Sequence, residues 1–429
     1  MKAAALATFA LVAASTLSVS TQDKPPMVSD QDVVEAYQYM LGRWVVLRQE
    51  TADLKKEFRW NEIVHRAPGD ASWANPRPDV VCSEAWVYVD ASSCTILKVP
   101  EIGARYYTVQ VLNGWGEVTA EINAYRYPQH PSGNFALCLQ RVRVPLAAGI
   151  QRVGLPNKKS RVLVRIELGA QAHEALALQK QVTLRATGSP EIEPVAAEFE
   201  FTNARLPGVG AFDKTDVILA SEADINKGLE ALQDKAGAVA KAAVDPKQRS
   251  HIDAAIRQQA IPDFLARIPK MGPMINGWVY PRVIGRYRDD YVMRSIASFT
   301  GLWASNGKEA IYFGAGELDG SQTYTQTFSG NAPPIKRARY SWSIAVIDGE
   351  RFRVMHDSQH RFLLGKQSPL KYNADGSLTL VFAPQRPATV PQSNWLPTPA
   401  GKKYTMTYRV AGSGADRVNE YYPPALITR

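Results

Sequence analysis

Asp79, Arg105 and Tyr106 are the first residues in the chain whose types could do chemistry together. A carboxylate, a guanidinium and a phenol suit the binding of a polar ligand or general acid–base work. We expect the three side chains to converge at one edge of the β domain predicted around them. The alternative role is an ion pair that closes a β-sandwich.

A second candidate group lies within five residues, at His356, Asp357 and His360. In an extended loop these side chains could face one ion. No third histidine lies nearby in the sequence and the spacing is not a recognised metal motif, so we predict no metal site. His360 and Arg361 fit better as side chains that face an anion or take part in a turn network.

Other catalytic patterns are weak. Paired carboxylates of the glycosidase kind could come from Asp289, Asp290, Glu309, Glu317 and Asp319, but the sequence does not give their separations. The serines at 83 and 341 lack a Gly-x-Ser-x-Gly elbow, which argues against a serine hydrolase. No dinucleotide or phosphate-binding glycine motif is present, so we expect no cofactor.

The segment 392–399 could form the wall of a ligand site. Pro397 and Pro399 fix φ and remove two N–H donors, which predicts a rigid, semi-extended arm. We expect Trp395 to press its indole against a sheet while the Asn394 amide holds nearby backbone. The arm is either a structural clamp or a pocket wall, and the second reading makes both residues ligand-binding candidates.

Residues 1–20 combine a short positive start, an apolar run rich in Ala and Leu, and small residues at the end. This order is typical of a secretory signal peptide, with a retained anchor as the alternative. We therefore expect a periplasmic or secreted protein. Export permits a disulfide among Cys82, Cys94 and Cys138, but the sequence does not say which two pair.

The net charge of +9 and pI of about 9.3 raise the question of an acidic partner. The basic residues form only short clusters, at 158–161 and 336–339, and no nucleic-acid recognition motif accompanies them. We predict a solvated basic surface and no nucleic-acid partner. No segment after residue 20 holds eighteen uninterrupted apolar residues, so we also expect no transmembrane segment.

The elements that must position these residues are mostly strands. Short alternating segments separated by turn residues predict two antiparallel jelly-roll-like or β-sandwich domains with a helical insert between them, an α+β, mainly β fold. The expected strands cover 85–89, 95–99, 105–112, 117–123, 134–142 and 161–167, then 310–313, 322–328, 339–347, 377–382 and 403–410.

Helices are expected in five places. Ser29 caps a helix that Gly42 would end, and residues 170–185 form another. Ser221 begins the clearest helix, which runs to Ala243, and further helices cover 247–260 and the residues after 262. The domain boundaries follow as 1–20 (signal peptide), 21–74 (helical or mixed), 75–187 (first β domain), 188–286 (connector and helices) and 287–429 (second β domain).

Two parts of the chain resemble known domains of unknown function. Residues 309–427 resemble domain 1214 through Leu318-Asp319-Gly320, Pro333-Pro334, Tyr340-Ser341-Trp342-Ser343, His360-Arg361-Phe362, Asn394 to Pro399 and Tyr422-Pro423-Pro424. Residues 75–185 resemble domain 1254 through Asn75, Asp79, Ser83, Ala85-Trp86, Asp90, Val99-Pro100 and Arg105-Tyr106-Tyr107. The resemblance implies two jelly-roll-like domains, export and a homo-oligomer, and no established reaction.

Two departures from the family pattern concern candidate residues. The usual Asn-x-Asp-Thr-x-Tyr-Ser is replaced by residues 79–83, where Cys82 and its neighbours supply neither the Thr hydroxyl nor the Tyr phenol. His360 stands where the family has Asn. If those groups line a site, the site of this chain is altered.

These observations predict an exported protein that binds a polar or amphipathic small molecule or a glycan, with hydrolase or lyase activity left open. The alternative is a non-catalytic envelope or assembly protein built from jelly rolls. The ligand-binding candidates are Asp79, Arg105, Tyr106, His360, Arg361, Asn394 and Trp395.

Overall fold

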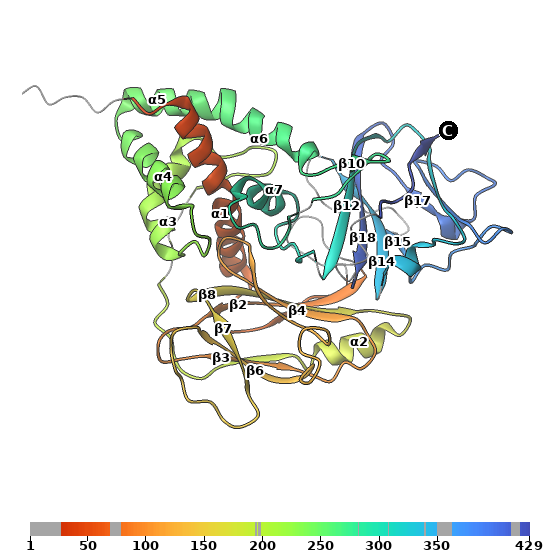
Figure 1. The fold of residues 1–429 in the computed structure, drawn as a ribbon, viewed down its shortest axis with the longest axis horizontal. Helices are drawn as coiled ribbons and strands as arrows, with labels where there is room; N and C mark the ends of the chain where they lie inside the picture. The colour runs from red at the N-terminus through yellow and green to blue at the C-terminus, as the bar shows by residue number, and fades with distance from the viewer. Residues whose placement is uncertain are drawn as a thin grey trace, which may run out of the picture.

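Two β-sandwiches and a layer of helices make up the protein (Figure 1). The computed structural model describes residues 27–68, 79–193, 195, 199–281, 283–307, 309–338, 340–349, 363–412 and 421–429. The predicted α+β, mainly β class is confirmed. Within these ranges no helix has both the length and the apolar character that crossing a bilayer requires.

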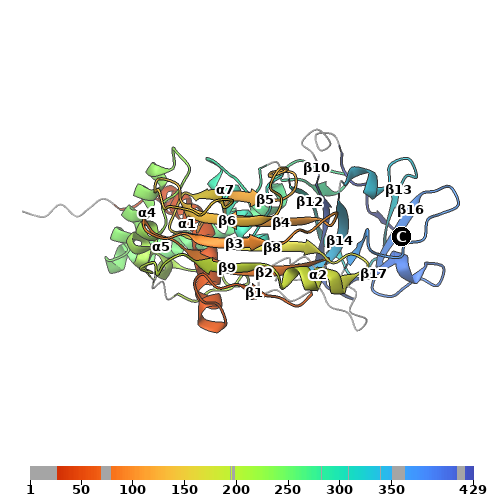
Figure 2. The ribbon, with the colours of Figure 1, turned by 90° about the horizontal axis from the view of Figure 1, so that it is seen from below.

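The first sandwich packs a five-stranded sheet against a four-stranded one. The five-stranded sheet has the order β1 (Val64–His65), β2 (Val80–Tyr88), β8 (Lys159–Glu167), β4 (Tyr107–Leu112) and β5 (Val118–Ile122). The other has the order β7 (Gln151–Leu155), β6 (Gly133–Leu139), β3 (Thr95–Val99) and β9 (Thr183–Ala186), and α2 (Ala172–Gln179) packs at one end (Figure 2). All pairs are antiparallel except β6–β7.

Strand β8 shows how the first sandwich meets the helices. Successive side chains point to opposite faces of a sheet. Val162 and Val164 lie in the core between the two sheets. Arg161 and Arg165, four residues apart, belong to the other face, and both are buried because helices and the segment after α7 cover that face.

The helical layer surrounds the 27-residue helix α1 (Figure 1). Its members are α1 (Asp30–Lys56), η1 (Val209–Lys214), α3 (Thr215–Ser221), α4 (Glu230–Ala242), α5 (Pro246–Ala255), the π-helical turn η2 (Ile256–Ala260), α6 (Ile261–Arg267), η3 (Ile268–Lys270) and α7 (Tyr291–Gly301).

Gly42 does not end the first helix, as the sequence had suggested, because α1 continues through it to Lys56. The glycine serves the close approach of α7. Its backbone N–H donates to Ser295 Oγ at 3.0 Å, and a Cβ at this position would lie 3.0 Å from the same oxygen. A missing side chain, rather than a helix stop, is what the position requires.

The predicted helix start at Ser221 is also wrong. Ser221 is the last residue of α3, and α4 begins only at Glu230. The predicted cap at Ser221 would place Glu222 in the first turn of a helix. Instead, Glu222 is buried and accepts hydrogen bonds from Gly114 N at 2.9 Å and Asn157 Nδ2 at 2.6 Å. Long-range hydrogen bonds therefore override the local capping pattern. The predicted helix over 170–185 similarly ends with α2, and β9 follows it.

The second sandwich packs a six-stranded sheet against a four-stranded one. The first has the order β10 (Met274–Ile275), β11 (Trp278–Val279), β12 (Ala310–Asp319), β18 (Lys403–Ala411), β14 (Ser341–Asp348) and β15 (Leu363–Gly365). The second has the order β17 (Trp395–Pro397), β16 (Leu378–Ala383), β13 (Tyr324–Phe328) and β19 (Ile427–Thr428), with the 3₁₀ turns η4 (Pro334–Arg337) and η5 (Gln392–Asn394) outside the sheets.

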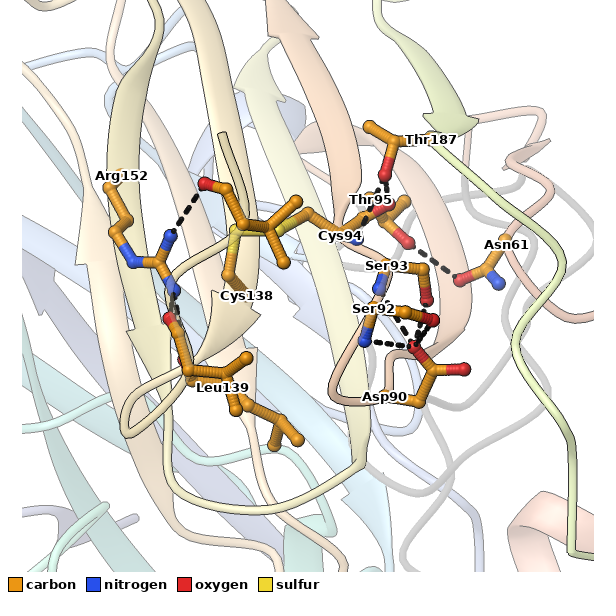
Figure 3. The surroundings of a disulfide bond; sticks show 12 residues. Asn61, Asp90, Ser92, Ser93, Cys94, Thr95, Cys138, Leu139, Arg152 and Thr187 are labelled. Carbon is orange, nitrogen blue, oxygen red and sulfur yellow. Dashed lines mark hydrogen bonds between the residues drawn. A yellow bond between two sulfur atoms is a disulfide. The ribbon is translucent and has the colours of Figure 1, made fainter. Parts of the chain in front are cut away.

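One disulfide joins neighbouring strands of the first sandwich (Figure 3). Cys94, just before β3, bonds to Cys138 on β6, and the third cysteine, Cys82, is buried and free. On one side of the bridge the Asp90 carboxylate accepts hydrogen bonds from the Ser92 and Ser93 amides and hydroxyls, which fixes the turn that leads to Cys94.

Candidate functional site: a cavity between the three parts

A cavity of about 660 Å³ lies where the first sandwich, the helical layer and the second sandwich meet. We call it the central cavity. Its lining comes from β8, from α6 through β11, from α7 and the residues after it, and from β12, β18 and their neighbours in the second sandwich. The lining includes Arg165, Leu265, Met274, Met293, Trp303, Tyr312, Gly314, Gly316, Glu317, Met406 and Arg409.

The floor of the central cavity is the face of β12 and β18 that looks away from the second sandwich's core. Tyr312 pairs with Arg409 and Gly314 with Thr407, so these residues share that face. A Cβ built on Gly314 would meet no atom within 4 Å, and one on Gly316 would meet only Thr405 Cγ2, at 3.9 Å. The two glycines therefore leave open space above the sheet.

The walls are largely apolar and unusually rich in methionine. Met271, Met274 and Met293 line the cavity on the side opposite the sheet floor, and a fourth of the eight methionines, Met406, borders it from the core side of β18. Methionine is flexible and polarisable, and suits surfaces that must adapt to ligand shape. Leu265 and Met274 are also exposed, at 43% and 62%, and so mark the opening to solvent.

Arg165 supplies a buried charge to the lining. Only 5% of the residue is exposed. Its guanidinium donates to Gln110 Oε1 and, at 3.3 Å, to the Trp303 carbonyl. Gln110 is itself held, since its Nε2 donates to the Ala304 carbonyl at 2.6 Å. No carboxylate among the described residues forms an ion pair with Arg165.

Other polar groups in the lining are few. Arg409 is buried, stands 5.8 Å from the centre of the Tyr312 ring and has further partners. The one carboxylate in the described lining belongs to Glu317, which is exposed and pairs with Lys403 at 2.5 Å. Its described lining residues include neither histidine nor cysteine. The described residues also contain no group of histidines, cysteines and carboxylates that could hold a metal ion.

The predicted trio at positions 79, 105 and 106 lies away from the central cavity. Asp79 and Arg105 both reach the end of β8: Asp79 O accepts from Leu168 N, and Arg105 Nη1 donates to Leu168 O at 2.8 Å. The Arg105 side chain pairs with Glu174 of α2 at 2.5 Å. The Tyr106 ring is buried and contacts the Tyr340 ring at 5.3 Å, across the junction of the two sandwiches.

The segment 392–399 forms η5 and the edge strand β17. Asn394 Nδ2 donates to the carbonyls of Lys371 and Thr379 at 2.7 and 2.9 Å, and its Oδ1 accepts from Lys371 N. Trp395 packs on the sheet, and its Nε1 donates to the Ala383 carbonyl at 2.9 Å. These contacts fit the clamp reading of the arm, and neither residue lines the central cavity.

The remaining candidates divide into two sets. His356, Asp357, His360 and Arg361 lie outside the described residues. The carboxylates considered for a glycosidase pair are dispersed: Asp290 caps α7, Glu309 accepts from Asn123, and Asp319 accepts from Ser321 N in a turn.

Sequence reasoning missed the central cavity. The available signal was the pair of glycines at 314 and 316, directly after the predicted strand 310–313 and inside the observed β12. Glycine in a strand interior often marks a bulge or the close approach of another group. The first applies here, because the β12–β18 register shifts between Ala315 and Leu318. No local sequence pattern marked Arg165 as a cavity residue, since its surroundings come from segments far apart in the chain.

The fold and cavity define a class of proteins with two sandwiches around a shared helical layer. Residues 60–186 match the family described as "Protein of unknown function (DUF1254)", and residues 312–414 match the one described as "Protein of unknown function (DUF1214)". The chain belongs to the family of two-domain proteins in which DUF1254 precedes DUF1214.

Solved structures with a similar fold exist, whereas no curated protein matches the chain. The crystal structure of the VPA0106 protein from Vibrio parahaemolyticus has a TM-score of 0.64 at 18% identity, covering 94% of this chain and 100% of that one. An uncharacterized protein from Burkholderia cenocepacia has a TM-score of 0.47 at 14% identity, covering 93% and 94%. The first likeness concerns the fold alone.

Proposed function

We propose that this is an exported protein that binds an elongated amphipathic small molecule in the central cavity. The observation that carries the proposal is the cavity itself, about 660 Å³ in volume, with a sheet floor left bare at Gly314 and Gly316. Small-molecule sites in proteins typically span about 300–1,000 Å³ and combine apolar walls with a few placed polar groups.

The chemistry of the walls favours an apolar chain over a glycan. A sugar presents hydroxyls on every side, and each buried hydroxyl needs a hydrogen-bond partner. The walls instead offer methionine, leucine, isoleucine and proline side chains, with the polar groups confined to a few positions.

Binding is favoured over hydrolysis by what the lining contains. Covalent catalysis needs a nucleophile within hydrogen-bond reach of a base. The described lining offers no histidine or cysteine, and its carboxylate, Glu317, is exposed and paired with Lys403. Export is supported by the composition of residues 1–20 and by the Cys94–Cys138 disulfide, which is typical of oxidising compartments.

Filling the floor of the cavity tests the proposal. Gly314→Leu places a side chain in the open space above β12, so binding of the apolar fluorescent dye N-phenyl-1-naphthylamine should weaken by at least about tenfold, or ~1.4 kcal/mol. Gly237→Leu is the matched control, because Gly237 on α4 also has no atom within 4 Å of an added Cβ and does not line the cavity.

The measurement is a fluorescence titration, with circular dichroism to show that each variant is folded. Equal dye affinity in the wild type, Gly314→Leu and Gly237→Leu would place the dye elsewhere and contradict the proposal. Absence of saturable binding of the dye and of long-chain lipids to the wild type would contradict it as well.

A further inference from the structure

Arg165 is a buried charge in the lining, and no carboxylate among the described residues pairs with it. An arginine keeps its charge at any physiological pH. A buried charge is strongly destabilising unless an opposite charge or several hydrogen bonds compensate it. Arg165 is 5% exposed, and its hydrogen bonds go to neutral groups, the Gln110 amide oxygen and the Trp303 carbonyl.

Arg161, four residues earlier on the same strand, shows how this fold satisfies a buried guanidinium. It is fully buried, bonds to Glu84 and lies 3.3 Å from Asp53. The Arg161 guanidinium also packs against the aromatic rings of Phe58 and Trp86. The protein therefore pairs Arg161 with its own carboxylates, whereas the described residues offer none to Arg165.

The group around Arg165 is held in place before any ligand arrives. Gln110 is fixed by its bond to the Ala304 carbonyl at 2.6 Å, and the Trp303 carbonyl fixes a second guanidinium nitrogen. Trp303 also lines the cavity, and its buried Nε1–H has no hydrogen-bond partner among the described residues. The guanidinium, fixed in this way, suits one small anionic group.

We propose that the ligand of the central cavity is a long-chain carboxylate, a fatty acid or a close relative, whose head group pairs with Arg165. This proposal rests on the proposed function. The planar guanidinium fork matches a carboxylate, and the single charge of Arg165 balances the single charge of the head group. The acyl chain then lies over Gly314 and Gly316, between the sheet floor and the methionines of the wall.

The first experiment needs no mutation. Dissociation constants of palmitate and hexadecanol are measured on the wild-type protein by displacement of the bound dye, at equal ionic strength. Both compounds have a sixteen-carbon chain, and they differ in the head group. Palmitate should bind at least about tenfold more tightly, the range expected for a charge-assisted pair against a neutral hydroxyl.

The second experiment removes the charge. Arg165→Met should weaken palmitate to the affinity of hexadecanol and leave hexadecanol unchanged. Arg267→Met is the control, because Arg267 is an exposed arginine of α6 that pairs with Asp263 and does not line the cavity. It should change neither affinity.

The outcomes separate this inference from the proposed function. Failure of dye, palmitate and hexadecanol alike to bind would end the proposed function. Equal binding of the two compounds, with no effect of Arg165→Met, would overturn the carboxylate assignment and leave the cavity as a site for neutral chains. Should Arg165→Met not fold, the wild-type comparison decides, and Arg165→Lys, which keeps the charge without the fork, should retain part of the preference for palmitate.

Discussion

Single residues in this protein take their roles from their partners more than from their types. Arg105, a predicted ligand residue, donates to the carbonyls of Glu167, Leu168 and Gln171 and so ties the end of β8 to α2. Arg165 is an arginine of the same sandwich with a different role, because it faces the cavity. The sequence identifies arginines in and beside strands. Whether such an arginine ties elements together or faces the cavity depends on residues that lie far away in the chain, such as Trp303.

The pKa of Asp90 tests whether the hydrogen bonds around a single residue form as described. Slight burial raises the pKa of its carboxyl, but the hydrogen bonds from Ser93 and Ser92 outweigh it and lower the pKa to about 2. A carboxyl whose pKa is lowered by folding stabilises the protein above its unfolded-state pKa of about 3.8, and that stabilisation is lost as the pH falls through about 2. Carbon-detected NMR titration of the aspartate carboxyls should find Asp90 near pH 2.

The matched variant Asp90→Ala removes the same interactions. It should be less stable than the wild type in urea at pH 6, and the difference should shrink toward pH 2. A titration of Asp90 at or above pH 3.8 would show that the turn beside Cys94 is not held in this way.

At the scale of elements, strands were easier to predict than helices. All the strands expected from alternating residues are present, with shifted ends, because alternation reports one buried face directly. Helix ends were harder, since Gly42 and Ser221 carry local stop and start signals that distant contacts override. Helix α7 was missed, and residues after 287 had been expected to form strands.

The close contact between α1 and α7 predicts that a larger side chain at Gly42 destabilises the protein. Gly42→Val places its side chain against Ser295, whose Oγ and Cα lie 3.0 and 3.2 Å from an added Cβ. Overpacking of this kind costs about 1–3 kcal/mol of unfolding free energy. Gly237→Val, with open space around it on α4, is the control and should change stability by less. Urea unfolding followed by circular dichroism measures both, and equal stabilities would contradict the close packing.

At the scale of the whole molecule, the central cavity exists because three separately predictable parts meet. The sequence indicates two sandwiches and a helical insert, but no local pattern says which sheet faces come together. Figure 1 shows α7 below α6, above the first sandwich and beside β12, where the lining segments converge. The candidate site could therefore be described only after the parts were assembled, although Gly314 and Gly316 had hinted at it.

The disulfide provides a prediction for the stability of the assembly. Cys94 and Cys138 are 44 residues apart in sequence. The entropy of closing a loop of that length corresponds to about 4 kcal/mol at 25 °C. Replacing both cysteines with serine should lower the unfolding free energy by about that amount under oxidising conditions, as measured by urea unfolding. Under reducing conditions the wild type should approach the variant, and an unchanged midpoint in both conditions would contradict the bridge.

The most direct test of the account is a crystal structure of the protein with palmitate bound. The account predicts the carboxylate within hydrogen-bond distance of the Arg165 guanidinium and the acyl chain lying over Gly314, between β12 and the wall that contains Met293. Density for palmitate at another surface, with the central cavity filled only by water, would contradict it.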